Sequence, residues 1–420
     1  MAEKVSDLNY KKEKITNKSI FSKDNVNTGH QPELNYLKAF MIILMTTQHI
    51  HENYSRDSSS IIIDYLNSVT GAPGFMLLMG IGMKYSRHQD PNNYIERGIL
   101  LLTKGLYVNL LKNALPNLIA WWATGNKKFI SRALLVIQTD ILMFAGISFL
   151  LLAIMKQKKL SDNIILIISF IMNIIALFLF KIMKSPNNFL FSQFLGYFVL
   201  TDADTYFPLF SYFVFVGMGN WLGGFYQKIS NKDKFYNIIL IICLPIITIY
   251  YYLRYSYTFP MFINWDSYEH YSLNPGPDAI FICMINLVAL AIFFKINLIL
   301  KGETPSLITH LGKNQNKYYM LSYIITMQSN ILLRATKGEE FPSKIKYPVL
   351  LCIIVLFLCK ITIDMNDKYL HFTITNLERS KRNFILTLIW IMTIISTIYI
   401  YPKVETYATF WNDYLYEEDY

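Results

Sequence analysis

Residues 162–182 read DNIILIISFIMNIIALFLFKI, an apolar run that carries charged residues only near its two ends. A helix needs about 20 apolar residues to cross the hydrocarbon layer of a bilayer, and this run has that length. Similar runs recur from Leu34 to Pro402, separated by short polar connections. The recurrence predicts an all-α protein, a polytopic transmembrane helix bundle of about ten or eleven spans.

Not every predicted span is equally apolar. Residues 97–122 contain Lys104, Lys112 and Asn113, side chains that lipid does not tolerate, so we expect that face to line the protein interior or a wet cavity. The runs that we interpret as spans are 34–50, 60–84, 97–122, 134–155, 162–182, 205–226, 235–253, 278–296, 315–333, 347–363 and 384–401.

The formal net charge of +10 would suggest a nucleic-acid partner in a soluble protein. Here the lysines and arginines lie mostly in the short connections, where they indicate topology, so we expect the lipid bilayer and no nucleic acid as partner. Every second connection between spans, beginning with the second, carries more lysine and arginine than the others, and the basic connections near 127–132 and 337–346 are the exceptions. This predicts a protein of the cell membrane whose N-terminus lies in the cytoplasm. We divide the chain into a flexible cytoplasmic tail (1–33), a membrane domain (34–402) and an acidic, aromatic C-terminal tail (403–420).

The four cysteines, Cys243, Cys283, Cys352 and Cys359, all lie inside apolar runs. Their spacing matches neither a disulfide framework nor a set of metal ligands. We therefore expect no disulfide and no metal site.

The first predicted span, LNYLKAFMIILMTTQH at 34–49, carries the residues that could do chemistry. Lys38 and His49 are eleven residues apart, which places them on one helical face about 16 Å apart along the axis. Glu52 follows His49 by three residues, close enough to orient the imidazole of a general base. The same pattern also fits an interfacial histidine and a lysine that anchors the span, and the spacing alone does not separate these interpretations.

The Lys-x10-His spacing resembles the Arg/Lys-x10-His motif of the acyltransferase-3 superfamily, membrane enzymes related to the lysosomal heparan glucosaminide N-acetyltransferases. Further segments resemble that superfamily in the same order: GAPGFMLLMG (71–80), DILMFAGI (140–147), YFPLF (206–210) leading to Gly217 and Gly223, and LGKNQ (311–315). Two departures are visible. The third span offers Lys104 and Lys112 in place of an arginine pair, and Met79 stands where a serine is usual.

The resemblance implies transfer of an acyl group, usually acetyl, from acetyl-CoA to a hydroxyl or amine of a carbohydrate or envelope molecule. Acetyl-CoA would be a co-substrate, and no cofactor would stay bound. Basic residues suited to the phosphates of the donor are Lys38, Lys84, Arg87, Arg97, Lys104, Lys112, Lys313 and Lys317, although each is also explained as an interfacial charge.

In this interpretation His49 takes the proton of the acceptor, or itself carries the acyl group, and Asn113 or Gln48 stabilises the oxyanion. Helix directions place Asp140, Asp202 and Asp204 on the side of His49. The longest outer connection adds Trp265 and Glu269, which suit a sugar as well as they suit an interfacial aromatic belt.

Two other classes of function remain open at this stage. Charged residues inside spans also mark solute pathways, so a transporter or flippase for a polar or lipid-linked solute is the main alternative. A membrane sensor or scaffold would be favoured if His49 proved dispensable.

Overall fold

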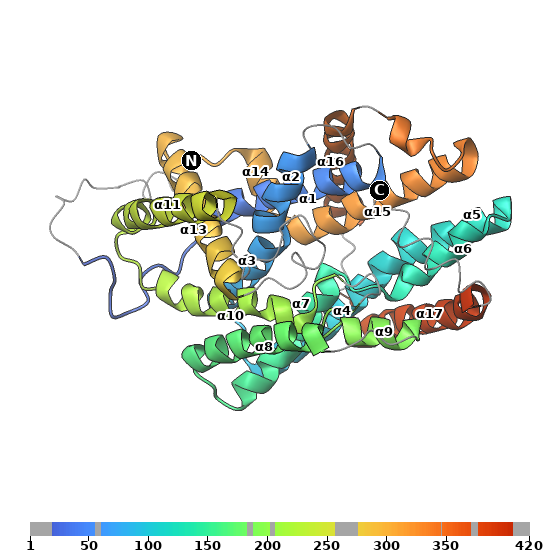
Figure 1. The fold of residues 1–420 in the computed structure, drawn as a ribbon. Coiled ribbons are helices and arrows are strands. Elements are labelled where there is room, and N and C mark those ends of the chain that lie inside the picture. Colours follow the sequence, from blue (N-terminus) through green and yellow to red (C-terminus); the bar gives the residue numbers. More distant parts are fainter. Residues whose placement is uncertain are drawn as a thin grey trace.

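The computed structural model describes residues 19–54, 60–182, 188–201, 206–256, 276–345, 347–370 and 377–405. Within these ranges the chain is helical, and the one β contact is an isolated bridge between Phe21 and Ile229. The all-α prediction is confirmed. The helices and helical turns, shown in Figure 1, are α1 (Pro32–Asn53), α2 (Ser60–Leu66), η2 (Asn67–Gly71), α3 (Ala72–Tyr85), α4 (Pro91–Asn109), η3 (Leu110–Ala114), α5 (Leu115–Thr124), α6 (Lys127–Ala133), η4 (Leu134–Ile137), α7 (Ile141–Gln157), α8 (Asp162–Ile182), α9 (Phe189–Gly196), α10 (Leu209–Tyr226), α11 (Lys232–Ser256), α13 (Gly276–Ile299), α14 (Ser306–Lys313), α15 (Gln315–Lys337), η5 (Pro342–Lys344), α16 (Pro348–Met365), η6 (Asn366–Leu370) and α17 (Arg379–Glu405).

Among the described residues, seven helical segments are long and apolar enough to cross a membrane. They are Ile62–Tyr85, Lys127–Gln157, Asp162–Ile182, Lys232–Leu253, Gly276–Ile299, Pro348–Tyr369 and Arg379–Val404, and each overlaps a predicted span. The other predicted spans also fall on helices, namely α1, α4 to α5, α10 and α15, but these are not among the seven. The chain is therefore a multi-pass membrane protein, and the total of ten or eleven crossings stays a prediction.

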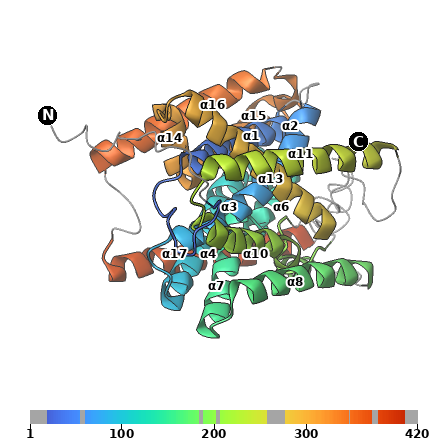
Figure 2. The ribbon, with the colours of Figure 1, turned by 90° about the vertical axis from the view of Figure 1, so that its left-hand side faces the viewer.

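Glycines allow two pairs of helices to approach closely. A Cβ atom on Gly80 of α3 would lie 2.4 Å from the carbonyl oxygen of Val216 in α10, and one on Gly219 would lie 2.1 Å from that of Leu77. Gly98 of α4 and Gly146 of α7 have the same relation, at 2.9 and 2.8 Å from each other's carbonyl oxygen. Membrane helices commonly associate through such small residues. Figures 1 and 2 show that α10 packs against α3, and also against α8.

The third predicted span is a continuous helix that contains one π turn. The π turn η3 separates α4 from α5, and α5 ends at Gly125, whose φ of 69° lies in the left-handed region. Lys112 and Asn113 lie in this turn and are each 2% exposed. The prediction that these side chains face the interior is confirmed, and such turns occur often at functional sites.

Part of the predicted N-terminal tail packs on the bundle. The backbone amides of Ser22 and Val26 donate to the carbonyl oxygens of Lys228 and Gln227 at 2.8 and 2.9 Å. Glu33 is fully buried and accepts from Lys232 at 2.8 Å. Residues 1–18, and residues 406–420 of the C-terminal tail, lie outside the described ranges.

The substitution Gly80→Ala tests the contact between α3 and α10. Its added methyl group would meet backbone atoms that cannot move aside, so we expect a loss of about 1–3 kcal/mol of stability. Gly82→Ala is the matched control, because a Cβ at Gly82 meets nothing within 4 Å. Thermal unfolding in detergent, followed by tryptophan fluorescence, compares them. Equal melting temperatures for the two variants would contradict the close approach.

Candidate active site

His49 and Glu52 lie in the last turn of α1 and contact each other. The Nδ1 atom of His49 is 3.2 Å from Oε2 of Glu52, and the amide of Gln48 donates to Oε1 at 2.9 Å. The contact that the spacing of three residues predicts is present. His49 keeps 19% of its side chain exposed, which leaves the imidazole accessible.

Tyr323 of α15 stacks on the imidazole. The two rings are 5° from parallel, and their centroids are 3.9 Å apart. The ammonium of Lys112 lies 3.7 Å from the centroid of the same phenol ring. Two groups this near one centroid cannot share a face, so His49 and Lys112 occupy opposite faces of Tyr323. The ring thereby connects α1 to the π turn of the third span.

Lys112 and Asp140 form a buried ion pair behind Tyr323. Their charged groups are 3.5 Å apart, and each side chain is 2% exposed. Asp140 precedes α7 as its N-cap, where Oδ1 accepts from the amide of Leu142 at 2.8 Å and Oδ2 accepts from the hydroxyl of Tyr319 at 2.6 Å. Such a pair persists in a dry interior because each charge has a counter-charge and the carboxylate has hydrogen-bond donors.

Amide side chains fix the π turn against the start of α7. Asn109 donates to the carbonyl oxygen of Gln138 at 2.7 Å, and Asn113 donates to that of Leu135 at 3.2 Å. Asn113 and Gln48 were our candidates for stabilising an oxyanion. In this structure the amide of Asn113 donates to the backbone and that of Gln48 donates to Glu52.

Contacts outside the site hold α15 in place. Glu339, just after α15, accepts from Arg132 of α6 at 3.0 Å and from Arg334 at 3.1 Å. Burial raises the pKa of Glu339, but the two guanidinium groups outweigh burial, so its pKa is lowered and it stays ionised. The hydroxyl of Tyr54 donates to Ser329 at 3.0 Å, which links α15 to the end of α1.

Two of the predicted donor-binding residues share a pocket. Lys38 and Arg97 line a cavity of about 300 Å³ with His30 and Asn35, near the N-terminal end of α1. Lys104 lies about two helical turns beyond Arg97 on α4 and is half-buried. A continuous α1 connects this pocket to His49, over the 16 Å or so that separate Lys38 and His49 along the axis.

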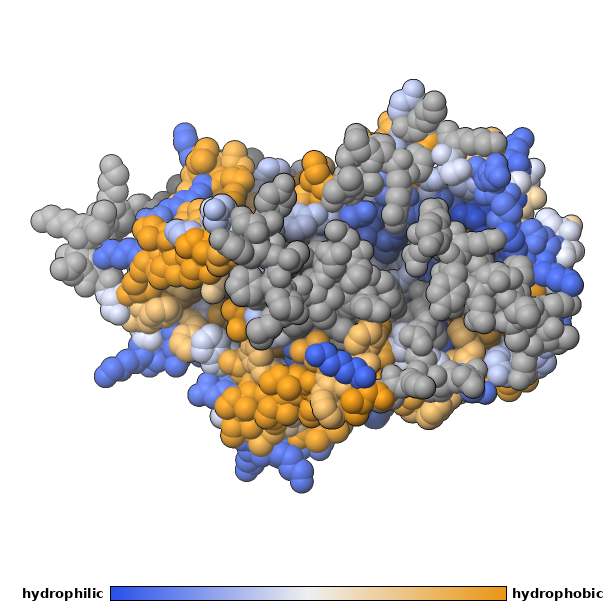
Figure 3. Space-filling view, viewed as in Figure 1, coloured by the Kyte–Doolittle hydropathy of each residue, from blue (hydrophilic) through white to orange (hydrophobic). Residues whose placement is uncertain are grey.

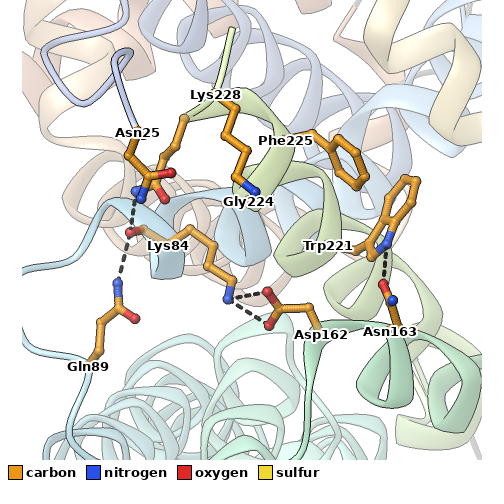
Figure 4. A pocket seen from close by; sticks show the side chains of 10 residues that line it. Asn25, Lys84, Gln89, Asp162, Asn163, Trp221, Gly224, Phe225 and Lys228 are labelled. Carbon is orange, nitrogen blue, oxygen red and sulfur yellow. Dashed lines mark hydrogen bonds and ion pairs between the residues drawn. The ribbon is translucent and has the colours of Figure 1, made fainter. Parts of the chain in front are cut away.

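The remaining donor candidates do not join that pocket. Lys84 pairs with Asp162 at 2.6 Å in a different pocket, shown in Figure 4. Lys317 pairs with Asp367 at 2.8 Å. Arg87 and Lys313 are exposed at the surface. The structure thus divides the predicted cluster of basic residues into separate places.

One of the five predicted acceptor residues lies within the described ranges. Asp202, Asp204, Trp265 and Glu269 lie outside the described residues. Asp140 is described, and both of its oxygens already have partners within the protein. Within the described ranges, no group of three His, Cys, Asp or Glu side chains is arranged to hold a metal ion.

Tyr319 and Tyr323 are site residues that sequence reasoning missed. They stand four residues apart in QNKYYMLSYI, soon after LGKNQ, so both point from one face of α15. This aromatic pair on an otherwise polar span is the signal that could have identified them.

The substitution Tyr319→Phe tests the buried ion pair. It removes the hydroxyl that donates to Asp140, so we expect a loss of about 1–3 kcal/mol of stability. Tyr36→Phe is the control, because the buried hydroxyl of Tyr36 has no hydrogen-bond partner among the described residues. Thermal unfolding measures both variants, and a Tyr319→Phe protein as stable as the control would refute the role of this contact.

A family model described as heparan-alpha-glucosaminide N-acetyltransferase, catalytic, matches residues 31–255, more than half of the chain. The match includes His49, Glu52, Lys112 and Asp140 but ends before α15. No curated protein and no solved structure matches the chain.

Proposed function

Since this chain belongs to the heparan-alpha-glucosaminide N-acetyltransferase catalytic family, we propose that it transfers an acetyl group from acetyl-CoA to an acceptor beyond the membrane. The observation that carries the proposal is the contact between His49 and Glu52 inside the matched region. The acceptor offers a hydroxyl or an amine, on a carbohydrate or another envelope molecule. The protein resides in the cell membrane with its N-terminus in the cytoplasm.

His49 is the general base of the proposed reaction. Glu52 accepts the hydrogen of Nδ1, so the lone pair of Nε2 is available to the acceptor. Nε2 removes the proton of the acceptor as its oxygen or nitrogen attacks the thioester carbonyl. The C–S bond then breaks, and the proton passes from Nε2 to the departing CoA thiolate. If His49 carries the acetyl group itself, the same residues are needed and an acetyl-histidine accumulates.

Lys38 and Arg97 bind the phosphates of the donor. Their shared pocket supports this role, because two cations and the amide of Asn35 line one cavity near the proposed cytoplasmic end of α1. The acyl-bearing arm of the donor then runs along α1 toward His49, and Lys104 adds a third cation near its path. The acceptor approaches from the opposite side. Asp202, Asp204, Trp265 and Glu269, which lie outside the described residues, are the proposed acceptor-binding residues.

Tyr323 positions the imidazole for catalysis. The hydrogen bond to Glu52 limits rotation of His49 within the plane of its ring, and stacking on Tyr323 sets the direction of that plane. Lys112 supports the opposite face of the phenol, and Asp140 balances its charge. Lys112 and Asp140 therefore act on His49 through Tyr323 rather than by touching the substrates.

The substitution His49→Ala tests the proposed reaction directly. We expect acetyl transfer from radiolabelled acetyl-CoA to envelope glycans to fall by about 10²–10⁴-fold, because that is the usual contribution of a general base. Glu52→Gln keeps the shape of the side chain but weakens the contact that orients His49. Its rate of acetyl transfer should lie between those of the wild type and His49→Ala. His88→Ala is the control, because the side chain of His88 is exposed and takes no part in the contacts of His49.

Two outcomes would count against this function. Equal activity of His49→Ala and His88→Ala would remove His49 from the mechanism. If membranes with the wild-type protein incorporate no more label than membranes without it, the enzyme proposal fails. Transport of a polar or lipid-linked solute is then the function to measure.

The pair Tyr323→Phe and Tyr323→Leu separates positioning from folding. Phenylalanine keeps the ring that stacks on His49, so most of kcat should remain, whereas leucine should lower kcat by about 10- to 100-fold. KM for acetyl-CoA should stay unchanged in both, because the donor pocket lies at the other end of α1. The positioning role would be contradicted if KM for acetyl-CoA rose as kcat fell, or if phenylalanine lowered kcat as much as leucine does.

A further inference from the structure

A second pocket lies where α3 ends, α8 begins and α10 ends. It has a volume of about 450 Å³, and Figure 4 shows the side chains that line it. Lys84, Asp162 and Asn163 form one side, and Trp221, Phe225 and Lys228 form the other. The active-site proposal uses none of these residues, so the pocket has no function so far.

The charges of this pocket favour an anion. Lys84 donates to both oxygens of Asp162 at 2.6 Å, so the two charges balance each other. Lys228 is exposed, and its ammonium has no ion-pair partner in the part of the chain that the structure describes. The nearby turn before α8 adds Lys158 and Lys159, both exposed. The lining of the pocket therefore carries a net charge of one positive unit, which is that of Lys228.

The outer face of α8 begins beside this pocket and is apolar. Asn163 accepts from the indole of Trp221 at 2.9 Å, and the next residue, Ile164, opens a stripe at intervals of three or four residues. Its members are 44–62% exposed: Ile164, Ile167, Ile171, Ile174 and Phe178. The stretch from Ile164 to Ile174 is about 15 Å long, half of a hydrocarbon layer of about 30 Å. Figure 3 shows an apolar patch over α8, with hydrophilic side chains below it.

We propose that this pocket binds the headgroup of an anionic phospholipid whose acyl chains lie along the stripe of α8. The phosphate pairs with Lys228, and the rings of Trp221 and Phe225, 4.4 Å apart, lie at the level of the headgroup. A soluble anion would use the cationic pocket alone, and a neutral lipid would use the stripe alone. An anionic lipid uses both, because it joins a negative charge to an acyl chain. This site is independent of acetyl transfer.

Native mass spectrometry of the full-length protein in detergent tests the proposal. Phosphatidylglycerol and phosphatidylcholine with identical acyl chains are the probes. We expect the wild type to retain phosphatidylglycerol preferentially, and Lys228→Gln to weaken that binding about fivefold, the usual contribution of one lysine at an anionic surface. Lys228→Arg should restore it. Lys181→Gln, an exposed lysine at the far end of α8, is the control and should bind like the wild type.

Three results would overturn the assignment. The first is equal retention of the two lipids by the wild type. The second is an equal loss in Lys228→Gln and Lys181→Gln, which would mean that any positive charge suffices. The third is displacement of phosphatidylglycerol by inorganic phosphate or acetyl-CoA, which would make the pocket a site for a soluble anion.

Discussion

The buried ion pair between Lys112 and Asp140 is the contact on which the candidate site depends. Two charges in a dry interior cost several kcal/mol each unless partners hold them, so the surrounding chain must bring them together accurately. The packing of α4 on α7 contributes to this, because Gly98 and Gly146 let the two backbones approach closely. The π turn then directs Lys112 toward the start of α7, where Asp140 is already held by the first turn of that helix. A bulkier residue at either glycine would push the two backbones apart where they cross.

The ion pair is linked to the candidate catalytic histidine through α15. The hydroxyl of Tyr319 donates a hydrogen bond to the carboxylate of Asp140. The ring of Tyr323 lies between the ammonium of Lys112 and the imidazole of His49. The family match ends at residue 255, so the contact of His49 with Glu52 and the ion pair lie within it, while the ring between them comes from a later helix. A fragment limited to the matched region would therefore keep His49 and Glu52 but lose the surface on which the imidazole rests.

Sequence reasoning predicted the helices well and the site in part. Apolar length identifies spans such as α8, because hydrocarbon demands it, and a spacing of three residues within one helix predicts the contact of Glu52 with His49. Lys112 was recognised as a residue that must face the interior. Its partner was not, since the contact with Asp140 depends on how α4 packs on α7, and no periodicity within one helix encodes that. Tyr323 was missed for the same reason, because its stacking on His49 joins α1 to α15, two helices that are far apart in the chain.

The grouping of the basic residues follows from a similar limit. In the sequence Lys38, Lys84 and Arg97 look equivalent, because each stands at the predicted cytoplasmic end of a span. In the structure Asp162, at the start of α8, neutralises Lys84, while Lys38 and Arg97 share a pocket whose described lining holds no carboxylate. Position along a span therefore places a charge at the membrane surface, but the carboxylates on neighbouring helices decide which charges remain able to attract a ligand. By that criterion Lys38 and Arg97 are the basic residues best suited to the proposed donor, and the pocket of Lys84 attracts an anion only through the unbalanced charge of Lys228.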